Sequence, residues 1–367
     1  MESRPFPAAD VLDPSDRRPE ITHALDAWLA LQERFALDPM RAVELLNEHG
    51  AAPTALRALG AEVDPRAVAG ARKLLRGAGA VAVPYSSNAY PARLRALVDA
   101  PPLLLVRGDA SALGAPAVAI VGSRACTAYG RAVARHFASE LARAGLVIVS
   151  GLAYGIDAAA HRAALDAGGR SVAVSACGID RTYPAEHRGL ASKIAASGAL
   201  VSEFPPATHP RREFFPLRNR LISGMSMALL VVEARERSGS LVTARHAANQ
   251  GITVFAVPGP IDAATSRGTN RLLREGAWVA TEPADLLAEL GSSAASPAEQ
   301  HARGVDDRGR AILDALRDAP ATRDELARRL GASAAVLALP LLELELTRHV
   351  EEDRDGQLRV VASRSEL

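Results

Sequence analysis

Residues 117–151 read AVAIVGSRACTAYGRAVARHFASELARAGLVIVSG. An apolar run at residues 117–121 is followed by an amphipathic pattern at 130–144 and by a second apolar run at 147–150. Buried strands that alternate with amphipathic helices are typical of a parallel sheet covered by helices on both faces. This segment therefore predicts an α/β fold.

The same alternation continues towards the C-terminus. We expect further strands at residues 171–175, 199–202, 227–233, 253–257 and 278–280, and helices at 158–167, 186–197, 218–223 and 243–250. Residues 103–106 form an additional apolar run that leads into this pattern. We assign residues 85–290 to an extended Rossmann-like, doubly wound domain.

Helical patterns flank this domain on both sides. Residues 1–84 show apolar clusters separated by Gly50, Pro53 and Gly60, which predicts a small helical, SAM-like domain. Residues 291–305 are small and polar, as is typical of a linker.

The last segment, residues 306–367, is expected to be a winged-helix domain. Helical patterns at 312–316, 322–330 and 334–346 precede two strand patterns at 350–352 and 358–361, with a turn at Asp355-Gly356. Thr322 and Glu325 have the spacing of a capping box.

Composition limits the classes of function. The 367 residues include 43 basic and 42 acidic side chains, so a nucleic-acid site must come from local clustering of charge. No apolar run approaches the roughly 20 residues that span a membrane, and the N-terminus does not resemble a signal peptide. Cys126 and Cys177 lack metal-ligand spacing. We expect a cytoplasmic protein without membrane contact, metal or other cofactor.

The first phosphate-binding loop is expected at Gly122, Ser123 and Arg124, directly after the strand 117–121. Parallel sheets bind ligands outside the carboxyl ends of their strands, where helix N-termini offer amides to anions. Arg124 could fork onto a phosphate. The alternative is an ordinary turn in which this arginine pairs with a carboxylate.

A second loop begins at Gly151, and Asp157 and His161 follow it one helical turn apart. Such a pair could be catalytic or structural. We favour helix capping by Asp157 and a structural hydrogen bond to His161, because no serine or cysteine nucleophile has a discernible partnership with them.

A cluster of arginines and aromatic residues occupies residues 211–224. Its members are Arg211, Arg212, Phe214, Phe215, Arg218, Asn219 and Arg220. Arginines that contact phosphates beside rings that stack on unpaired bases suit single-stranded nucleic acid. In the alternative, the phenylalanines fill the core and the arginines are merely solvated. We expect Arg218, Asn219 and Arg220 to contact DNA.

The third loop is expected at Ser238, Gly239 and Ser240, which follow the strand ending at Glu233 and open a helix. Several such loops at one sheet edge favour an extended groove over a pocket for a single nucleotide.

Together these segments resemble the DprA/Smf family of DNA-processing proteins. The matching segments are VGSR at 121–124, SGLAYGID at 150–157, CGIDRTYP at 177–184, SEFP at 202–205, FPLRNRLISG at 215–224, SGSLVTA at 238–244 and FAVPG at 255–259. The resemblance implies a non-enzymatic protein of natural transformation that binds and protects single-stranded DNA, dimerises and helps to load the recombinase RecA.

Two other functions stay open from the residues alone. A nucleoside-monophosphate phosphoribohydrolase has a similar fold, and Asp157 and Glu233 would be its only credible catalytic carboxylates here. The winged helix could bind duplex DNA, although Asp324 and Glu325 offset the nearby arginines. A partner-binding or structural role is favoured for that domain.

Overall fold

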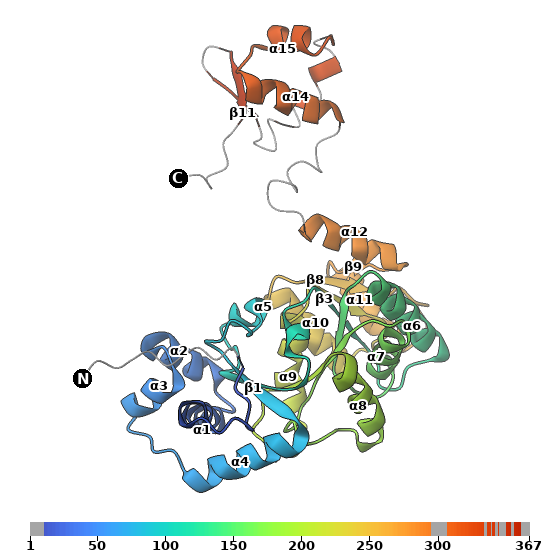
Figure 1. The fold of residues 1–367 in the computed structure, drawn as a ribbon. Coiled ribbons are helices and arrows are strands. Elements are labelled where there is room, and N and C mark those ends of the chain that lie inside the picture. The colour runs from blue at the N-terminus through green and yellow to red at the C-terminus, as the bar shows by residue number, and fades with distance from the viewer. Residues whose placement is uncertain are drawn as a thin grey trace, which may run out of the picture. The chain divides into compact units, whose positions relative to one another are not determined.

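A nine-stranded sheet forms the centre of the larger part of the chain (Figure 1). This computed structural model describes residues 11–294, 307–333, 336–338, 340–341, 344, 350–353 and 356–360. The chain divides into two compact units, Met1–Leu287 and Ala288–Leu367.

The strand order across the sheet is β1-β2-β6-β5-β4-β3-β7-β8-β9. The strands are β1 (Ala80–Pro84), β2 (Leu103–Gly108), β3 (Ala117–Val121), β4 (Val147–Ser150), β5 (Ser171–Val174), β6 (Ala199–Ser202), β7 (Ala228–Val231), β8 (Thr253–Ala256) and β9 (Trp278–Val279). Neighbours from β6 across to β9 pair in parallel, whereas β2 pairs antiparallel with both β1 and β6. The predicted α/β fold is confirmed, with an antiparallel edge added to the parallel sheet.

Helices cover both faces because the strands are apolar on both. In β2, Leu103 and Leu105 join one hydrophobic cluster, while Leu104 and Val106 join another. The first cluster includes side chains of the four N-terminal helices, which lie between residues 19 and 78, of α7 (Ile156–Asp166) and of α8 (Arg188–Ser197). The second includes side chains of α5 (Ala92–Arg95), η1 (Ala110–Leu113), α9 (Phe214–Gly224) and α10 (Gly239–Asn249).

Four other elements complete the connections in this part of the chain. They are α6 (Ala128–Arg143), η2 (Ala185–His187), α11 (Arg267–Arg274) and α12 (Pro283–Ala294). Thr127 caps α6 by accepting a hydrogen bond from the Gly130 amide, so the helix begins two residues earlier than its apolar pattern.

The N-terminal residues are helical, as their periodicity predicts. The helices are α1 (Pro19–Arg34), α2 (Pro39–His49), α3 (Ala52–Ala58) and α4 (Pro65–Ala78), and they lie together beside β1 (Figure 1). Helices α1, α2 and α4 each start at a proline, and the residue before that proline is an arginine in α1 and an aspartate in α2 and α4. Because these helices share a hydrophobic cluster with the sheet, and β1 itself precedes residue 85, the boundary at residue 84 stays a prediction.

The second unit contains the predicted winged helix. It has α14 (Asp307–Asp318), α15 (Arg323–Arg329) and a hairpin of β10 (Val350–Glu352) and β11 (Leu358–Val360) around its own apolar cluster. The capping box of Thr322 and Glu325 is confirmed. Residues 336–338, 340–341 and 344 of the predicted third helix are helical. The rest of that helix, the turn residue Asp355 and linker residues 295–305 lie outside the described residues. Within the part of the chain that is described, none of the helices has both the length and the apolar character needed to cross a membrane.

Candidate functional site

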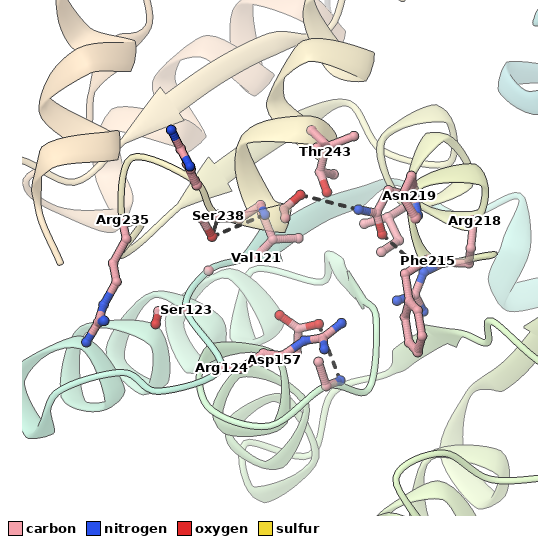
Figure 2. A pocket seen from close by; sticks show the side chains of 18 of the residues that line it. Val121, Ser123, Arg124, Asp157, Phe215, Arg218, Asn219, Arg235, Ser238 and Thr243 are labelled. Carbon is pink, nitrogen blue, oxygen red and sulfur yellow. Dashed lines mark hydrogen bonds between the residues drawn. The ribbon is translucent and has the colours of Figure 1, made fainter. Parts of the chain in front are cut away.

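The order of the strands reverses between β3 and β7. From β3 the chain continues to β4 on one side, and after β6 it crosses back to β7 on the other side of β3. Ligands of open α/β sheets bind outside the carboxyl ends of the strands at such a switch point. A cavity of about 450 Å³ lies here, lined by residues of the loops after β3, β4 and β7 and of α9 and α10 (Figure 2).

Gly122 and Ser123 form the cavity wall directly after β3. A side chain at Gly122 would place its Cβ 2.6 Å from Cγ1 of Ile156, so this position requires glycine. The Ser123 amide donates to the Glu233 carbonyl at 2.8 Å, which fixes the loop after β3 to the loop after β7.

Arg124 also lines the cavity, and its side chain is exposed. Its guanidinium carbon lies 5.0 Å above the ring of Phe215. Among the described residues, no carboxylate lies within ion-pair distance of this guanidinium. The alternative, an ordinary turn in which Arg124 pairs with a carboxylate, is therefore wrong. Arg124 retains its charge and its hydrogen-bond donors for a ligand.

Arg218 lies beneath this loop and is 3% exposed. It donates to the carbonyl oxygens of Gly151 and Val174 and to Oδ1 of Asn219. Burial lowers the pKa of its guanidinium to about 10, while Asp157 acts in the opposite direction, so Arg218 stays charged at neutral pH. It contributes a fixed positive charge to the cavity floor.

Gly151 makes room for this buried arginine. An added Cβ would lie 2.6 Å from Nη2 of Arg218 and 2.9 Å from Oδ2 of Asp157. Gly151 therefore shapes the cavity through Arg218, and it is absent from the residues that line the cavity.

Asp157 and His161 have separate structural roles. Oδ2 of Asp157 accepts from the amides of Gly151 and Ala153, and burial raises the pKa of this carboxyl. His161 bonds instead to the Leu152 amide and to Oγ of Ser171. The structural interpretation of these residues is supported, but the hydrogen bond of His161 is not to Asp157, and the cap position of α7 is Gly155.

The third predicted loop lies on the opposite wall of the cavity (Figure 2). Ser238 caps α10 by accepting from the Ser240 amide, and the two hydroxyl oxygens are 2.7 Å apart. Asn219 donates to the Gly239 carbonyl at 3.4 Å and so connects α9 to this loop. Ser238, Gly239, Ser240 and Asn219 all line the cavity, as expected for a composite site.

Arg220 does not belong to this site. Its guanidinium forms a bidentate ion pair with Glu203, with 2.7 Å from nitrogen to oxygen in each of the two hydrogen bonds. It also donates to Oδ2 of Asp99 at 2.9 Å. The side chain is 3% exposed and is absent from the cavity lining. The predicted DNA contact of Arg220 is therefore replaced by a structural role, in which it joins α9 to the segments before β2 and after β6.

The two phenylalanines also differ from each other. Phe214 is 6% exposed and stacks on Phe204 with ring centroids 4.6 Å apart, so it fills the core. Phe215 is half-buried, lines the cavity and carries Arg124 over its ring. The core-filling alternative is right for Phe214 alone.

Two further arginines, Arg235 and Arg237, line the cavity and are exposed. The predicted site does not include them, because in the segment after β7 only Ser238, Gly239 and Ser240 have the pattern of a phosphate-binding loop. Their place just after the strand beside β3 is the signal that could have identified them. With Arg124 and Arg218 they make four arginines against one carboxylate, Asp157, along the cavity.

Glu233, the other carboxylate considered for catalysis, holds the loop after β3. Its oxygens accept from the amide and hydroxyl of Thr127 at 2.9 and 2.5 Å. A Cβ at Gly130 would lie 2.4 Å from the carboxylate carbon of Glu233, which shows how closely α6 packs on it. Glu233 does not line the cavity.

Comparisons with known proteins identify the family of the chain. The family model for DNA recombination-mediator protein A matches residues 82–291, and the model for the DprA winged helix domain matches residues 294–356. Protein Smf of Escherichia coli is 41% identical over 290 residues, which cover 76% of this chain and 77% of that protein. DNA processing protein DprA of Bacillus subtilis is 43% identical over 216 residues, 59% of this chain and 73% of that protein.

Two solved structures have related folds. DNA processing protein A from Streptococcus pneumoniae matches with a TM-score of 0.59 and 34% identity, covering 73% of this chain and 94% of that one. DNA processing protein A from Helicobacter pylori, studied for its single-stranded DNA binding mode, matches with a TM-score of 0.52 and 33% identity, covering 55% of this chain and 93% of that one. The chain belongs to the DNA recombination-mediator protein A family, the DNA-binding DprA/Smf proteins.

Proposed function

We propose that the cavity at the switch point binds the phosphates of single-stranded DNA. The observation that carries this proposal is Arg124, an exposed arginine at the cavity wall that has no carboxylate within ion-pair distance among the described residues. Arg235, Arg237 and the start of α10 offer further donors to the same anion.

A single strand fits this site better than a mononucleotide. The three exposed arginines come from two separate loops, after β3 and after β7, which suits a chain of successive phosphates (Figure 2). The related protein from Helicobacter pylori, which binds single-stranded DNA, supports the same ligand for this chain.

The wider role that we propose is that of a recombination mediator in natural transformation. The protein would protect incoming single-stranded DNA and help to load RecA, acting in the cytoplasm as a homodimer and without catalysis. Membership of the DprA/Smf family supports this role.

The phosphoribohydrolase alternative has less support. Both carboxylates that it requires are engaged, Glu233 by Thr127 and Asp157 by backbone amides beside Arg218. We therefore propose no second function for the cavity.

Substitution of Arg124 tests the proposed site. Arg124→Ala is expected to weaken binding of oligo(dT) and to reduce the slope of log K against log salt by roughly 0.7, the loss of one phosphate contact on a single strand. Fluorescence anisotropy at several salt concentrations measures both quantities. Arg135→Ala is the matched control, because Arg135 is exposed on α6 and lies outside the cavity lining. Wild-type affinity and slope for Arg124→Ala would exclude the proposed phosphate site.

A further inference from the structure

Two exposed tyrosines lie outside the cavity lining. Tyr154, in the loop between β4 and α7, is 43% exposed, and Tyr183, between β5 and η2, is 47% exposed. Both loops leave the carboxyl edge of the parallel strands, the edge that also carries the cavity. The sequence patterns for phosphate binding included neither ring.

A ring contact connects Tyr183 to the cavity. The Tyr183 ring lies 5.5 Å from the ring of Phe215, and Arg124 lies 5.0 Å above Phe215. The loop that carries Tyr154 follows β4, and the loop that carries Tyr183 follows the adjacent strand β5. Tyr183 and Phe215 are thus in ring contact beside Arg124, and Tyr154 lies on the neighbouring loop; we call these three residues the aromatic row.

The free ring surface in this row belongs to the tyrosines. Phe214 is buried against Phe204, and one face of Phe215 is covered by the Arg124 guanidinium. Tyr154 and Tyr183 each leave close to half of their surface accessible, at 43% and 47%.

The Tyr154 ring is already fixed in position. Its hydroxyl donates to Oε2 of Glu186 at 2.7 Å, and its ring packs edge-on against His187 with centroids 5.0 Å apart. His187 is in turn bonded to the Leu152 carbonyl at 2.8 Å. A ring held in this way loses little conformational entropy when a planar group stacks on it.

Resting on the proposed function, we propose that the aromatic row is a base-stacking subsite. A single strand with one phosphate at Arg124 lays its neighbouring unpaired bases on Tyr183 and Tyr154. Every base has a π-face, so this contact tolerates any sequence, and a duplex cannot use it because its base faces are covered by neighbouring pairs.

This subsite sets the side on which the strand leaves the cavity. The row leads from Phe215 of α9 towards η2 and the start of α7, and so away from β8 and β9 at the other end of the sheet. Binding energy for single strands then has two separable parts, a salt-dependent part at the cavity and a base-dependent part at the row.

The test compares two probes on the full-length protein. Oligo(dT) offers phosphates and bases, whereas an abasic strand of the same length offers phosphates alone. The double variant Tyr154→Leu, Tyr183→Leu is expected to bind oligo(dT) about fivefold or more weakly. Its affinity for the abasic strand and its salt slope are expected to stay at wild-type values, whereas Arg124→Ala weakens binding of both probes.

Two control variants make the result specific. Tyr183→Phe retains the ring and should bind oligo(dT) like wild type, and Tyr129→Leu removes a tyrosine of 56% exposure that lies on α6 outside the row. Three results would each overturn the subsite. The double leucine variant could lose equal affinity for both probes, or lose no affinity for oligo(dT). Tyr183→Phe could also lose as much affinity for oligo(dT) as the double leucine variant. In all three cases the response of Arg124→Ala still reports separately on the cavity.

Discussion

At the scale of single residues, Gly151 shows how the site depends on a position outside the cavity lining. Gly151→Ala would bring a methyl group to 2.6 Å from Nη2 of the buried Arg218. Because Arg218 is held by two carbonyl oxygens and cannot move freely, we expect a loss of roughly 1–3 kcal/mol in the free energy of unfolding. Urea denaturation measures this loss, and DNA affinity should fall with it.

The matched control for this prediction is Gly189→Ala in α8. An added Cβ at Gly189 meets no atom within 4 Å, so alanine there should be neutral or stabilise the helix by about 0.5–1 kcal/mol. If the two variants unfolded at the same urea concentration, the steric account of Gly151 would be incorrect.

The residues of α9 also show what sequence reasoning can and cannot assign. Arg218 and Arg220 are two positions apart, which on a helix separates them by roughly 200°, so both cannot face one cavity. Periodicity alone could have excluded one of them. It could not have shown which one, because the carboxylate partners of Arg220, Glu203 and Asp99, are distant in the sequence.

At the scale of elements, His161 connects α7 to β5 and to the loop after β4. It accepts from the Leu152 amide through Nε2 and contacts Oγ of Ser171 through Nδ1, and Ser171 donates to the Ile148 carbonyl. Nδ1 therefore carries the proton and the ring is neutral. Burial, with smaller contributions from Arg218 and His187, lowers the pKa of His161 from 6.5 to about 3.

This shift predicts a pH dependence of stability. Below pH 6.5 the unfolded chain binds a proton that the folded chain excludes, so the contribution of His161 is complete above that pH and is lost as the pH falls towards 3. Between pH 7.5 and 5.5 the loss should be about 1 kcal/mol. Urea denaturation at several pH values should show a flatter dependence for His161→Gln than for wild type, whereas equal slopes would contradict the assignment.

The strands of the parallel sheet were predictable because each is a short apolar run bounded by polar or glycine residues, as at Ala117–Val121. The antiparallel edge was harder to predict. Ala80–Pro84 contains two alanines and ends in proline, which weakens a strand pattern, and its pairing with β2 rests on contacts with α4 and other helices that local sequence does not reveal.

At the scale of the whole molecule, the two units divide the work of the protein unequally. All residues that line the cavity lie within Met1–Leu287. In the second unit, Arg323 of α15 pairs with Glu352 at 2.8 Å, and Arg329 donates to the Ala319 carbonyl at 2.8 Å. These arginines are engaged inside their own domain, which argues against a winged helix that reads duplex DNA.

Removal of residues beyond Gly304 tests this division. The affinity of the shortened chain for oligo(dT) is expected to stay within about twofold of wild type, with the same salt slope. Each phosphate contact contributes to that slope, and the deletion removes none of the proposed contacts. Weak duplex binding should be equally unaffected, since Arg323 and Arg329 of α15 already have partners. Anisotropy with both ligands measures these affinities, and sedimentation of the two chains shows whether the proposed dimer persists. A selective loss of duplex binding would instead assign DNA contact to the winged helix, and a change of mass to that of a monomer would assign it the dimer interface.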